Sequence, residues 1–365
     1  MSFIDIVNEW DNFDFDGFFE SVTDTDILRA ISKETLTKHD FLTLLSPKAA
    51  KHLESMAQKA NALTLQHFGK AKLLYAPLYI ANYCENQCIY CGFNCTNHIK
   101  RKKLTFDEVR EESEALYDLG IRNILVLTGE SRAKSPVDYI ADCLKIIHEK
   151  FSSIGIEVYE LTTQEYKQLV DAGADSFCMY QETYDRDVYK SVHLRGPKMD
   201  YQYRLDAPER ACKAGMRSVN IGALLGLSKW RKDFFFTGLH ADYLQNNYPE
   251  VEISVSPPRM RPHVGSYQPV EIVTDADIVQ IITAFRLFMP RAGISVSTRE
   301  RAEFRDNLLP LGVTKISAES STEVGGYAHK NTNTPQFDIS DDRTVKDVQD
   351  MLIAKGYQPV YHDWY

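Results

Sequence analysis

The chain has 365 residues, of which 44% are hydrophobic and 25% are charged. This composition is that of a folded globular protein and excludes a disordered, collagen-like or coiled-coil chain. Lys and Arg number 42 against 51 Asp and Glu, so the net charge is −9 at pH 7, which argues against nucleic-acid binding as the main task. The length accommodates one large α/β barrel with terminal extensions.

The first ten residues are acidic and lack the basic stretch and apolar run of a secretory signal. No window approaches the roughly 18 apolar residues of a membrane span. We therefore expect a cytoplasmic protein without membrane association. In that compartment the seven cysteines are expected to be reduced, and a group of them indicates metal binding or catalysis. Four of the seven fall within twelve positions, namely Cys84, Cys88, Cys91 and Cys95.

In chain order, residues 1–70 contain helical patterns without a strand signal, and we expect a helical N-terminal extension. From about Leu73, short apolar runs alternate with amphipathic segments of ten to fifteen residues, the pattern of βα units around a parallel sheet. The expected strands are about Tyr75–Ala81, Asn123–Leu127, Glu157–Glu160, Ser176–Tyr180, Ser218–Ile221, Glu252–Val255, Ile294–Ser297 and Thr314–Ile316.

The clearest helix follows the first strand, because Thr105 and Glu108 form a capping box and Gly120 is placed to end the helix. Eight βα units within about 250 residues predict a TIM-type (β/α)8 barrel over residues 71–320, with an open doubly wound sheet as the alternative. Residues 321–365 show no further strand–helix alternation beyond a helix near Val345–Lys355. We expect this C-terminal tail to pack across the barrel.

The cysteines lie directly after the first expected strand, where catalytic residues of such barrels lie. Cys84, Cys88 and Cys91 are spaced Cys-x3-Cys-x2-Cys. Three thiolates on a short loop hold three irons of a [4Fe–4S] cluster and leave the fourth open to a ligand such as S-adenosylmethionine. A zinc site completed by Cys95 or His98 is one alternative. A cluster closed for electron transfer by Cys95 is another; we interpret Cys95 as a bystander.

The three-cysteine spacing, with an aromatic residue before the last cysteine, resembles the signature of radical S-adenosylmethionine enzymes. Other segments are similar to the 2-iminoacetate synthase family, the tyrosine lyases of bacterial thiazole synthesis, and the likeness covers about residue 70 to the end. These segments are residues 78–83, 91–93, 99–102, 180–184, 193–198, 297–300, 317–318, 325–327 and 362–364.

The resemblance implies an activity, cofactors and partners. Members of this family hold a [4Fe–4S] cluster and S-adenosylmethionine, and they remove a hydrogen from the amino group of L-tyrosine before its Cα–Cβ bond breaks. The products are 2-iminoacetate, 4-methylphenol, 5′-deoxyadenosine and methionine. Because the imine is short-lived in water, the implied protein partner is the thiazole synthase that consumes it. A flavodoxin or ferredoxin is the implied electron donor.

The resemblance also implies residues for binding S-adenosylmethionine. Tyr90 is expected to approach the adenine through its backbone. Thr128-Gly129-Glu130 resembles a Gly-Gly-Glu motif, in which Gly129 and Glu130 meet the methionyl ammonium; a helix N-cap is the structural alternative for Glu130. Gly222 begins a segment similar to one that packs against adenine, although Lys229 replaces its glutamate. Further candidates are Glu160 and Glu182, for the ribose and the ammonium, and Arg204, for the methionyl carboxylate.

The tyrosine substrate needs its own anchor near the radical carbon. Arg299, just past the seventh expected strand, fits a bidentate carboxylate clamp, and Ser317, after the eighth, adds a hydrogen bond. Residues 259–263 are expected to meet the phenol. The basic run of residues 98–103 is either a solvated loop or an attractor of an acidic electron donor, and we favour the second interpretation.

Two related enzymes remain as alternatives. The hydrogenase-maturation tyrosine lyase needs a second cluster bound by cysteines in a C-terminal extension, whereas the last cysteine here is Cys212. This absence favours the thiazole enzyme. A tryptophan lyase is the other enzyme alternative, and a closed-cluster electron carrier is the alternative outside enzymes.

Overall fold

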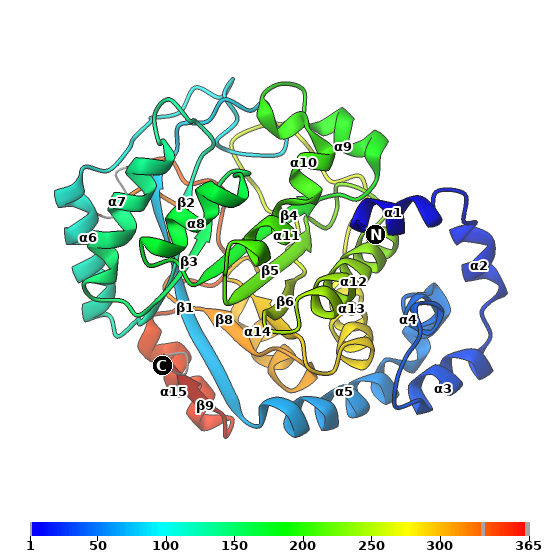
Figure 1. Ribbon diagram of the computed structural model, residues 1–365. Coiled ribbons are helices and arrows are strands. Elements are labelled where there is room, and N and C mark those ends of the chain that lie inside the picture. The colour runs from blue at the N-terminus through cyan, green and yellow to red at the C-terminus, as the bar shows by residue number, and fades with distance from the viewer. Residues whose placement is uncertain (1, 330–332, 362–365) are drawn as a thin grey trace.

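A closed parallel barrel forms the centre of the computed structural model, which describes residues 2–329 and 333–361 (Figure 1). Within these residues the sheet order is β2-β3-β4-β5-β6-β7-β8-β1-β9, and the pairing of β1 with β2 closes the barrel. The strands are β1 (Ala71–Ala81), β2 (Asn123–Thr128), β3 (Ser153–Glu157), β4 (Ser176–Glu182), β5 (Ser218–Ala223), β6 (Glu252–Ser256), β7 (Gly293–Val296), β8 (Lys315–Ser317) and β9 (Gln358–Val360). The predicted (β/α)8 fold is confirmed.

The third strand differs from its prediction. It spans Ser153–Glu157, whereas the sequence predicted a strand over residues 157–160. The observed strand therefore ends at the residue where the predicted strand begins. Gly155 weakens the strand signal of its segment, and it is closely packed in the sheet, where a Cβ would lie 2.8 Å from Ser176 Oγ and 3.0 Å from a Leu125 methyl. As a result Glu157, rather than Glu160, stands at the carboxyl end of this strand.

Helices surround the barrel on its outer side (Figure 1). The capping box of α6 is present as predicted: Thr105 N donates to Glu108 Oε2 (2.8 Å) and Glu108 N to Thr105 Oγ1 (3.2 Å). The barrel helices are α6 (Phe106–Asp118), α7 (Val137–His148), α8 (Thr163–Asp171), α9 (Arg186–Val192), α10 (Tyr201–Leu205), α11 (Ala207–Lys213), α12 (Trp230–Asn247), α13 (Asp275–Phe288) and α14 (Ala302–Leu308).

The N-terminal segment is helical, as expected, and it packs on α12 and α13. Phe3 stacks on His240 with ring centres 3.9 Å apart, and Phe41 stacks on Phe288 at 4.5 Å. Buried side chains of these helices join the hydrophobic core of the barrel in one cluster. The helices are α1 (Phe3–Glu9), α2 (Phe15–Ser21), α3 (Asp24–Ser32), α4 (Lys38–Leu44) and α5 (Leu53–Phe68).

The C-terminal tail contains a strand that the sequence pattern did not predict. After α15 (Val345–Ala354), β9 (Gln358–Val360) pairs in parallel with Ala71–Leu73 of β1. The expectation of no further strand–helix alternation was therefore wrong. The strand is short and contains Pro359, which is tolerated because β9 is an edge strand.

Within residues 2–329 and 333–361, no helix is long and apolar enough to cross a membrane. The amino ends of the barrel strands enclose a cavity of about 500 Å³. A second cavity lies at the carboxyl ends and contains residues from the predicted site. Tyr75, Leu125 and Tyr180 line both cavities, so one layer of side chains separates them.

Candidate active site

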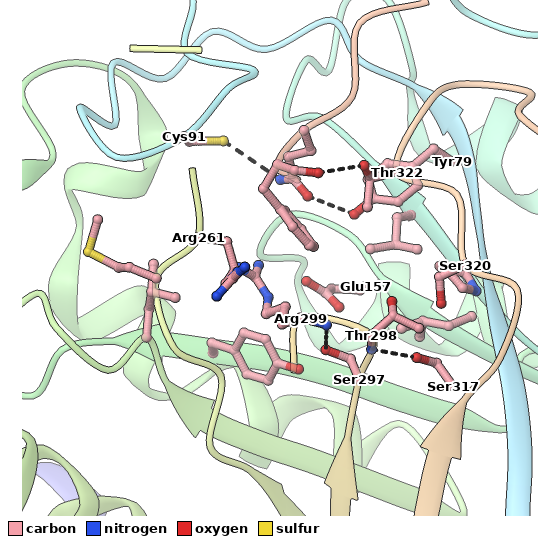
Figure 2. A pocket seen from close by; sticks show the side chains of 18 of the residues that line it. Tyr79, Cys91, Glu157, Arg261, Ser297, Thr298, Arg299, Ser317, Ser320 and Thr322 are labelled. Carbon is pink, nitrogen blue, oxygen red and sulfur yellow. Dashed lines mark hydrogen bonds between the residues drawn. The ribbon is translucent and has the colours of Figure 1, made fainter. Parts of the chain in front are cut away.

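The cavity at the carboxyl ends of the strands has a volume of about 130 Å³. It is lined by Cys91 from the cysteine loop, by residues that follow β7 and β8, and by residues of the C-terminal tail (Figure 2). Arg299 and Ser317, both predicted as substrate anchors, lie on its wall with Cys91. Catalytic groups of (β/α)8 enzymes occupy this end of the barrel.

Cys84, Cys88 and Cys91 lie in a loop without regular structure, and the Cys91 thiol is an electrostatic neighbour of both Cys84 and Cys88. Burial, together with the nearby Cys91 thiol, raises the pKa of Cys84 to about 11. Burial also raises the pKa of Cys88 well above its usual value, and Cys91 and Cys84 add to the rise against the opposing charge of Lys198. Thiols such as Cys84 and Cys88, whose pKa values are raised, form stable thiolates when a strongly cationic group binds them.

The donor set fits an iron–sulfur cluster better than a single metal ion. Among the described residues, no three His, Cys, Asp or Glu side chains surround a point that would hold one ion, as zinc requires. A [4Fe–4S] cluster instead spreads its thiolates around a cube. The strongest electrostatic neighbours of Cys84 and Cys88 include Cys91 but not Cys95. Three cysteine ligands and one open iron therefore stay our prediction for this loop.

Several hydrogen bonds hold the cysteine loop. The Asn86 side chain donates to Glu130 and accepts from Lys198 N (3.0 Å). Gln87 N donates to Arg195 O, and Leu194 N donates back to Gln87 O. Residues 193–198, which the sequence singled out without a role, thus form one wall of the loop.

Most of the basic run after the loop has internal partners. Arg101 donates to the carbonyls of Asn82 (2.7 Å), Phe93 (2.9 Å) and Asn94 (2.6 Å), so it closes the cysteine loop. Lys102 pairs with Glu108 at 2.9 Å, and Lys103 lies over the Tyr139 ring. Three of the basic side chains therefore have structural contacts within the chain. The role of the basic run in attracting an electron donor stays a prediction.

Tyr90 lies between two of the cysteines and is buried. Its hydroxyl lies 2.7 Å from His193 Nε2, while His193 Nδ1 lies 2.8 Å from Tyr189 O. A carbonyl oxygen can only accept a hydrogen bond, so His193 Nδ1 must carry the imidazole proton. His193 Nε2 is then unprotonated and accepts the hydrogen bond from the Tyr90 hydroxyl. Burial lowers the pKa of His193 to about 2, so the imidazole is neutral.

Two predicted carboxylates, Glu160 and Glu182, form a buried charged group with Arg204 beside the loop. Arg204, which is 7% exposed, donates to Glu160, to Glu182 Oε1 (3.4 Å) and to Tyr180 O (2.8 Å). Burial opposes ionisation of Glu160 and Glu182, but the Arg204 and Lys198 charges outweigh it and hold both pKa values below normal.

Glu130 lies beside the same group but is held differently. Burial and the Glu160 carboxylate raise the pKa of Glu130. Its carboxylate accepts from Asn86, and it is not a helix N-cap, since Pro136 occupies that position of α7. An acid of this kind is stabilised by a cation that binds next to it.

Two predicted glycines stand where the backbone approaches another chain segment closely. A Cβ at Gly129 would lie 2.4 Å from Tyr83 O, and a Cβ at Gly222 would lie 2.4 Å from Ser256 O. Both positions therefore require glycine for packing. Their contacts with S-adenosylmethionine stay predictions.

The two predicted substrate anchors carry hydrogen-bond donors toward the cavity. The described contacts of the Arg299 side chain are a hydrogen bond from Nη1 to Arg259 O (3.5 Å) and the Phe337 ring at 3.5 Å, and neither is an ion pair. Ser317 Oγ accepts from Thr298 N (3.0 Å), which leaves its proton for donation. A guanidinium without a carboxylate partner at a cavity wall suits an incoming carboxylate.

Of the segment expected to meet the phenol, Met260 and Arg261 line the cavity. Arg259 is committed elsewhere, because its side chain pairs with Glu300 and with Asp275 (3.0 Å). Arg261 donates to Ser340 of the tail.

Glu157 lines the cavity and was missed because its strand was placed three residues too late. Figure 2 shows its carboxylate and Arg299 in the same cavity. Burial, and next the Glu182 carboxylate, raise the pKa of Glu157 to about 7, against the opposing charges of Arg299 and Arg204 and a hydrogen bond from Cys178. A signal was available, since Glu157 follows the alternating apolar Ile154 and Ile156.

A parallel (β/α)8 barrel with three cysteines after β1 defines the class of radical S-adenosylmethionine enzymes. The family model of the radical SAM superfamily matches residues 78–236, and that of the biotin and thiamin synthesis associated domain matches residues 256–358. The chain is 41% identical to the 2-iminoacetate synthase of Escherichia coli over 98% of this chain and 96% of that protein. The Salmonella typhimurium 2-iminoacetate synthase is equally similar, with 98% and 94% covered. The chain therefore belongs to the 2-iminoacetate synthase family.

Two solved structures are similar to the whole barrel. HydG, a maturase of the [FeFe]-hydrogenase, superposes with a TM-score of 0.91 at 32% identity, over 96% of this chain and 80% of that chain. Methylornithine synthase, with a TM-score of 0.74 and 22% identity, over 92% of this chain and 97% of that chain, shares the fold. The motif at residues 362–364 lies outside the described residues.

Proposed function

We propose that this chain is a radical S-adenosylmethionine lyase that cleaves the Cα–Cβ bond of L-tyrosine to 2-iminoacetate and 4-methylphenol. One observation carries the proposal: Cys91 of the three-thiol loop and the anchors Arg299 and Ser317 line the same cavity. Hydrogen-atom abstraction requires the amino group to lie a few ångströms from the radical carbon. When bound, the cluster and S-adenosylmethionine supply that abstraction.

The buried charged group is proposed to bind S-adenosylmethionine. Glu130 has a raised pKa and lies beside the cysteine loop, so a methionyl ammonium would stabilise its charge. Glu160 and Glu182 are ionised and are available to ribose hydroxyls through their remaining lone pairs. Arg204 orients these two carboxylates and has further donors for the methionyl carboxylate.

On the substrate side, Arg299 is proposed to bind the tyrosine carboxylate and Ser317 to donate a hydrogen bond to it. Glu157 is proposed to receive the ammonium, because it faces the same cavity as Arg299 and forms no ion pair with it within the described residues. The amino group must lose a proton before a hydrogen atom is removed from its neutral form, and the Glu157 carboxylate is the acceptor available.

Two partners follow from the chemistry. A short-lived imine favours direct transfer to the thiazole synthase that consumes it. Forming these products from tyrosine and S-adenosylmethionine consumes two electrons per turnover, so we propose a flavodoxin or ferredoxin-type donor that docks near the cysteine loop.

Anaerobic turnover tests the function. The cluster-loaded protein is incubated with S-adenosylmethionine, a reductant, and either L-tyrosine or L-tryptophan. We expect 4-methylphenol and 5′-deoxyadenosine to form in proportion with tyrosine, and glyoxylate to appear as the imine hydrolyses. An indole product from tryptophan, without 4-methylphenol from tyrosine, would replace the proposal with the tryptophan lyase.

The role of Glu157 predicts a pH dependence. Its carboxylate is ionised above about pH 7, so kcat/KM is expected to fall as pH drops through this value. Glu157→Gln is expected to lower kcat/KM by about 100-fold at pH 8 and to remove the acidic limb of the profile. Steady-state rates between pH 6 and pH 9 measure both effects. An unchanged acidic limb in the variant would assign the titration to another group.

A further inference from the structure

Gln336, in the C-terminal tail, touches a cysteine that binds the cluster. Its Nε2 lies 3.6 Å from Cys91 Sγ, a hydrogen-bond distance for sulfur. Its Oε1 accepts from the Tyr79 hydroxyl at 2.7 Å. No residue assigned to cofactor or substrate supplies this contact, and the two residues lie 245 positions apart in the chain.

The chemistry of the two neighbours fixes the orientation of the Gln336 amide. A cluster-bound thiolate has no proton, so only a donor can face it favourably. Burial raises the pKa of Tyr79 well above its usual value, which keeps its hydroxyl protonated as a donor. The amide therefore presents its oxygen to Tyr79 and its nitrogen to Cys91, and the two bonds polarise each other in sequence.

Hydrogen bonds within the C-terminal tail also fix the position of Gln336. Gln336 N donates to Thr322 O at 3.0 Å, and Thr322 Oγ1 donates to Phe337 O at 2.9 Å. A Cβ at Gly92 would lie 2.3 Å from Gln336 O, so glycine beside Cys91 permits the tail to approach. The contact between tail and cysteine loop is thus built by several residues.

We propose that Gln336 is a positioning residue for the cluster, whose amide donates a hydrogen bond to the Cys91 thiolate and makes the cluster easier to reduce. Reduction adds negative charge to the cluster and its sulfurs. A hydrogen bond to a sulfur stabilises this charge, so it raises the reduction potential. The proposal rests on the proposed function only for the presence of the cluster.

Gln336→Met tests this proposal, since methionine is similar in length and has no donor. The midpoint potential of the cluster is measured by titration followed with electron paramagnetic resonance, without tyrosine. We expect an unchanged iron content, a more negative midpoint potential, and a smaller reduced fraction at a fixed solution potential. Equal potentials in the two proteins would overturn the proposal.

Phe337→Leu is the matched control in the same segment. Phe337 packs on Arg299 and not on a cysteine, so its replacement is expected to raise KM for tyrosine and leave the potential unchanged. A potential shift of equal size in both variants would show a general disturbance of the tail and overturn the specific role of the Gln336 amide.

A spectroscopic measurement on the unmodified chain completes the test. The protein is labelled with ¹⁵N-glutamine, reduced, and examined by electron–nuclear double resonance. We expect a ¹⁵N coupling that is lost in the Gln336→Met variant. If the methionine variant does not load with iron, Gln336→Glu takes its place and is expected to lose the coupling as well. Absence of the coupling in the unmodified protein would overturn the proposal. Neither measurement uses turnover, so a failure of tyrosine cleavage would not overturn the role of Gln336. Likewise, a failure of the Gln336 measurements would not overturn the proposed tyrosine cleavage.

Discussion

Cys88→Ala is expected to abolish both cluster binding and tyrosine cleavage. Cys88 is 5% exposed, and the Cys84 and Cys91 thiols are close enough to raise its pKa. Without it, two thiolates remain to hold a cube that requires three. After anaerobic reconstitution, we expect iron and sulfide near the level of a blank, and no 5′-deoxyadenosine above the reaction without enzyme. Metal analysis and product chromatography check this result.

Cys95→Ala is the matched control, because Cys95 lies in the same loop. Its backbone N–H donates to Asn86 O at 2.9 Å, a bond that alanine keeps. We expect four irons per chain and an unchanged rate. In the reduced variant, S-adenosylmethionine is expected to perturb the paramagnetic resonance as in the unmodified protein. Loss of one quarter of the iron would instead identify Cys95 as a fourth ligand and contradict the open-site assignment.

Arg299→Lys is expected to lower kcat/KM for tyrosine by about 100-fold, mainly through KM. Lysine keeps the charge but loses the planar fork that binds both carboxylate oxygens, at a cost of about 2–3 kcal/mol. It also loses the stacking on Phe337, where the guanidinium carbon lies 3.5 Å from the ring centre. Initial rates at varied tyrosine, with S-adenosylmethionine saturating, separate KM from kcat.

Arg301→Lys controls for charge and backbone position. Arg301 lies two residues further on, its side chain is 56% exposed, and it pairs with Asp275 at 2.6 Å. An exposed pair of this kind contributes about 0–1 kcal/mol, so neither KM nor kcat is expected to change. Equal losses in the Arg299 and Arg301 variants would contradict the carboxylate clamp.

The sequence predicted those parts of the site that depend on local spacing or on strand ends. Three cysteines within eight positions need no long-range information, and Arg299 follows a strand whose boundaries were placed within one residue. The barrel followed from the alternation of apolar runs and amphipathic segments.

Other parts required the folded chain. Glu157 was missed because Gly155, which is closely packed between strands, weakened the signal of its own strand. β9 was missed because a three-residue edge strand that contains Pro359 has almost no local signal. The role of Gln336 depends on tertiary placement alone, since nothing near residue 336 in the sequence indicates a cysteine partner.

The loop that carries the cysteines has almost no regular structure of its own, and its shape is held by residues 44, 112 and 245 positions away. Such contacts form only after the intervening chain has collapsed, so the iron site is among the last features to appear during folding. In a zinc finger the metal ligands and the fold are local, whereas here the bonds that shape the cysteine loop reach distant parts of the chain. A chain still emerging from the ribosome with only its first half exposed has all three cysteines but still lacks Lys198 and Gln336, two of the loop's partners.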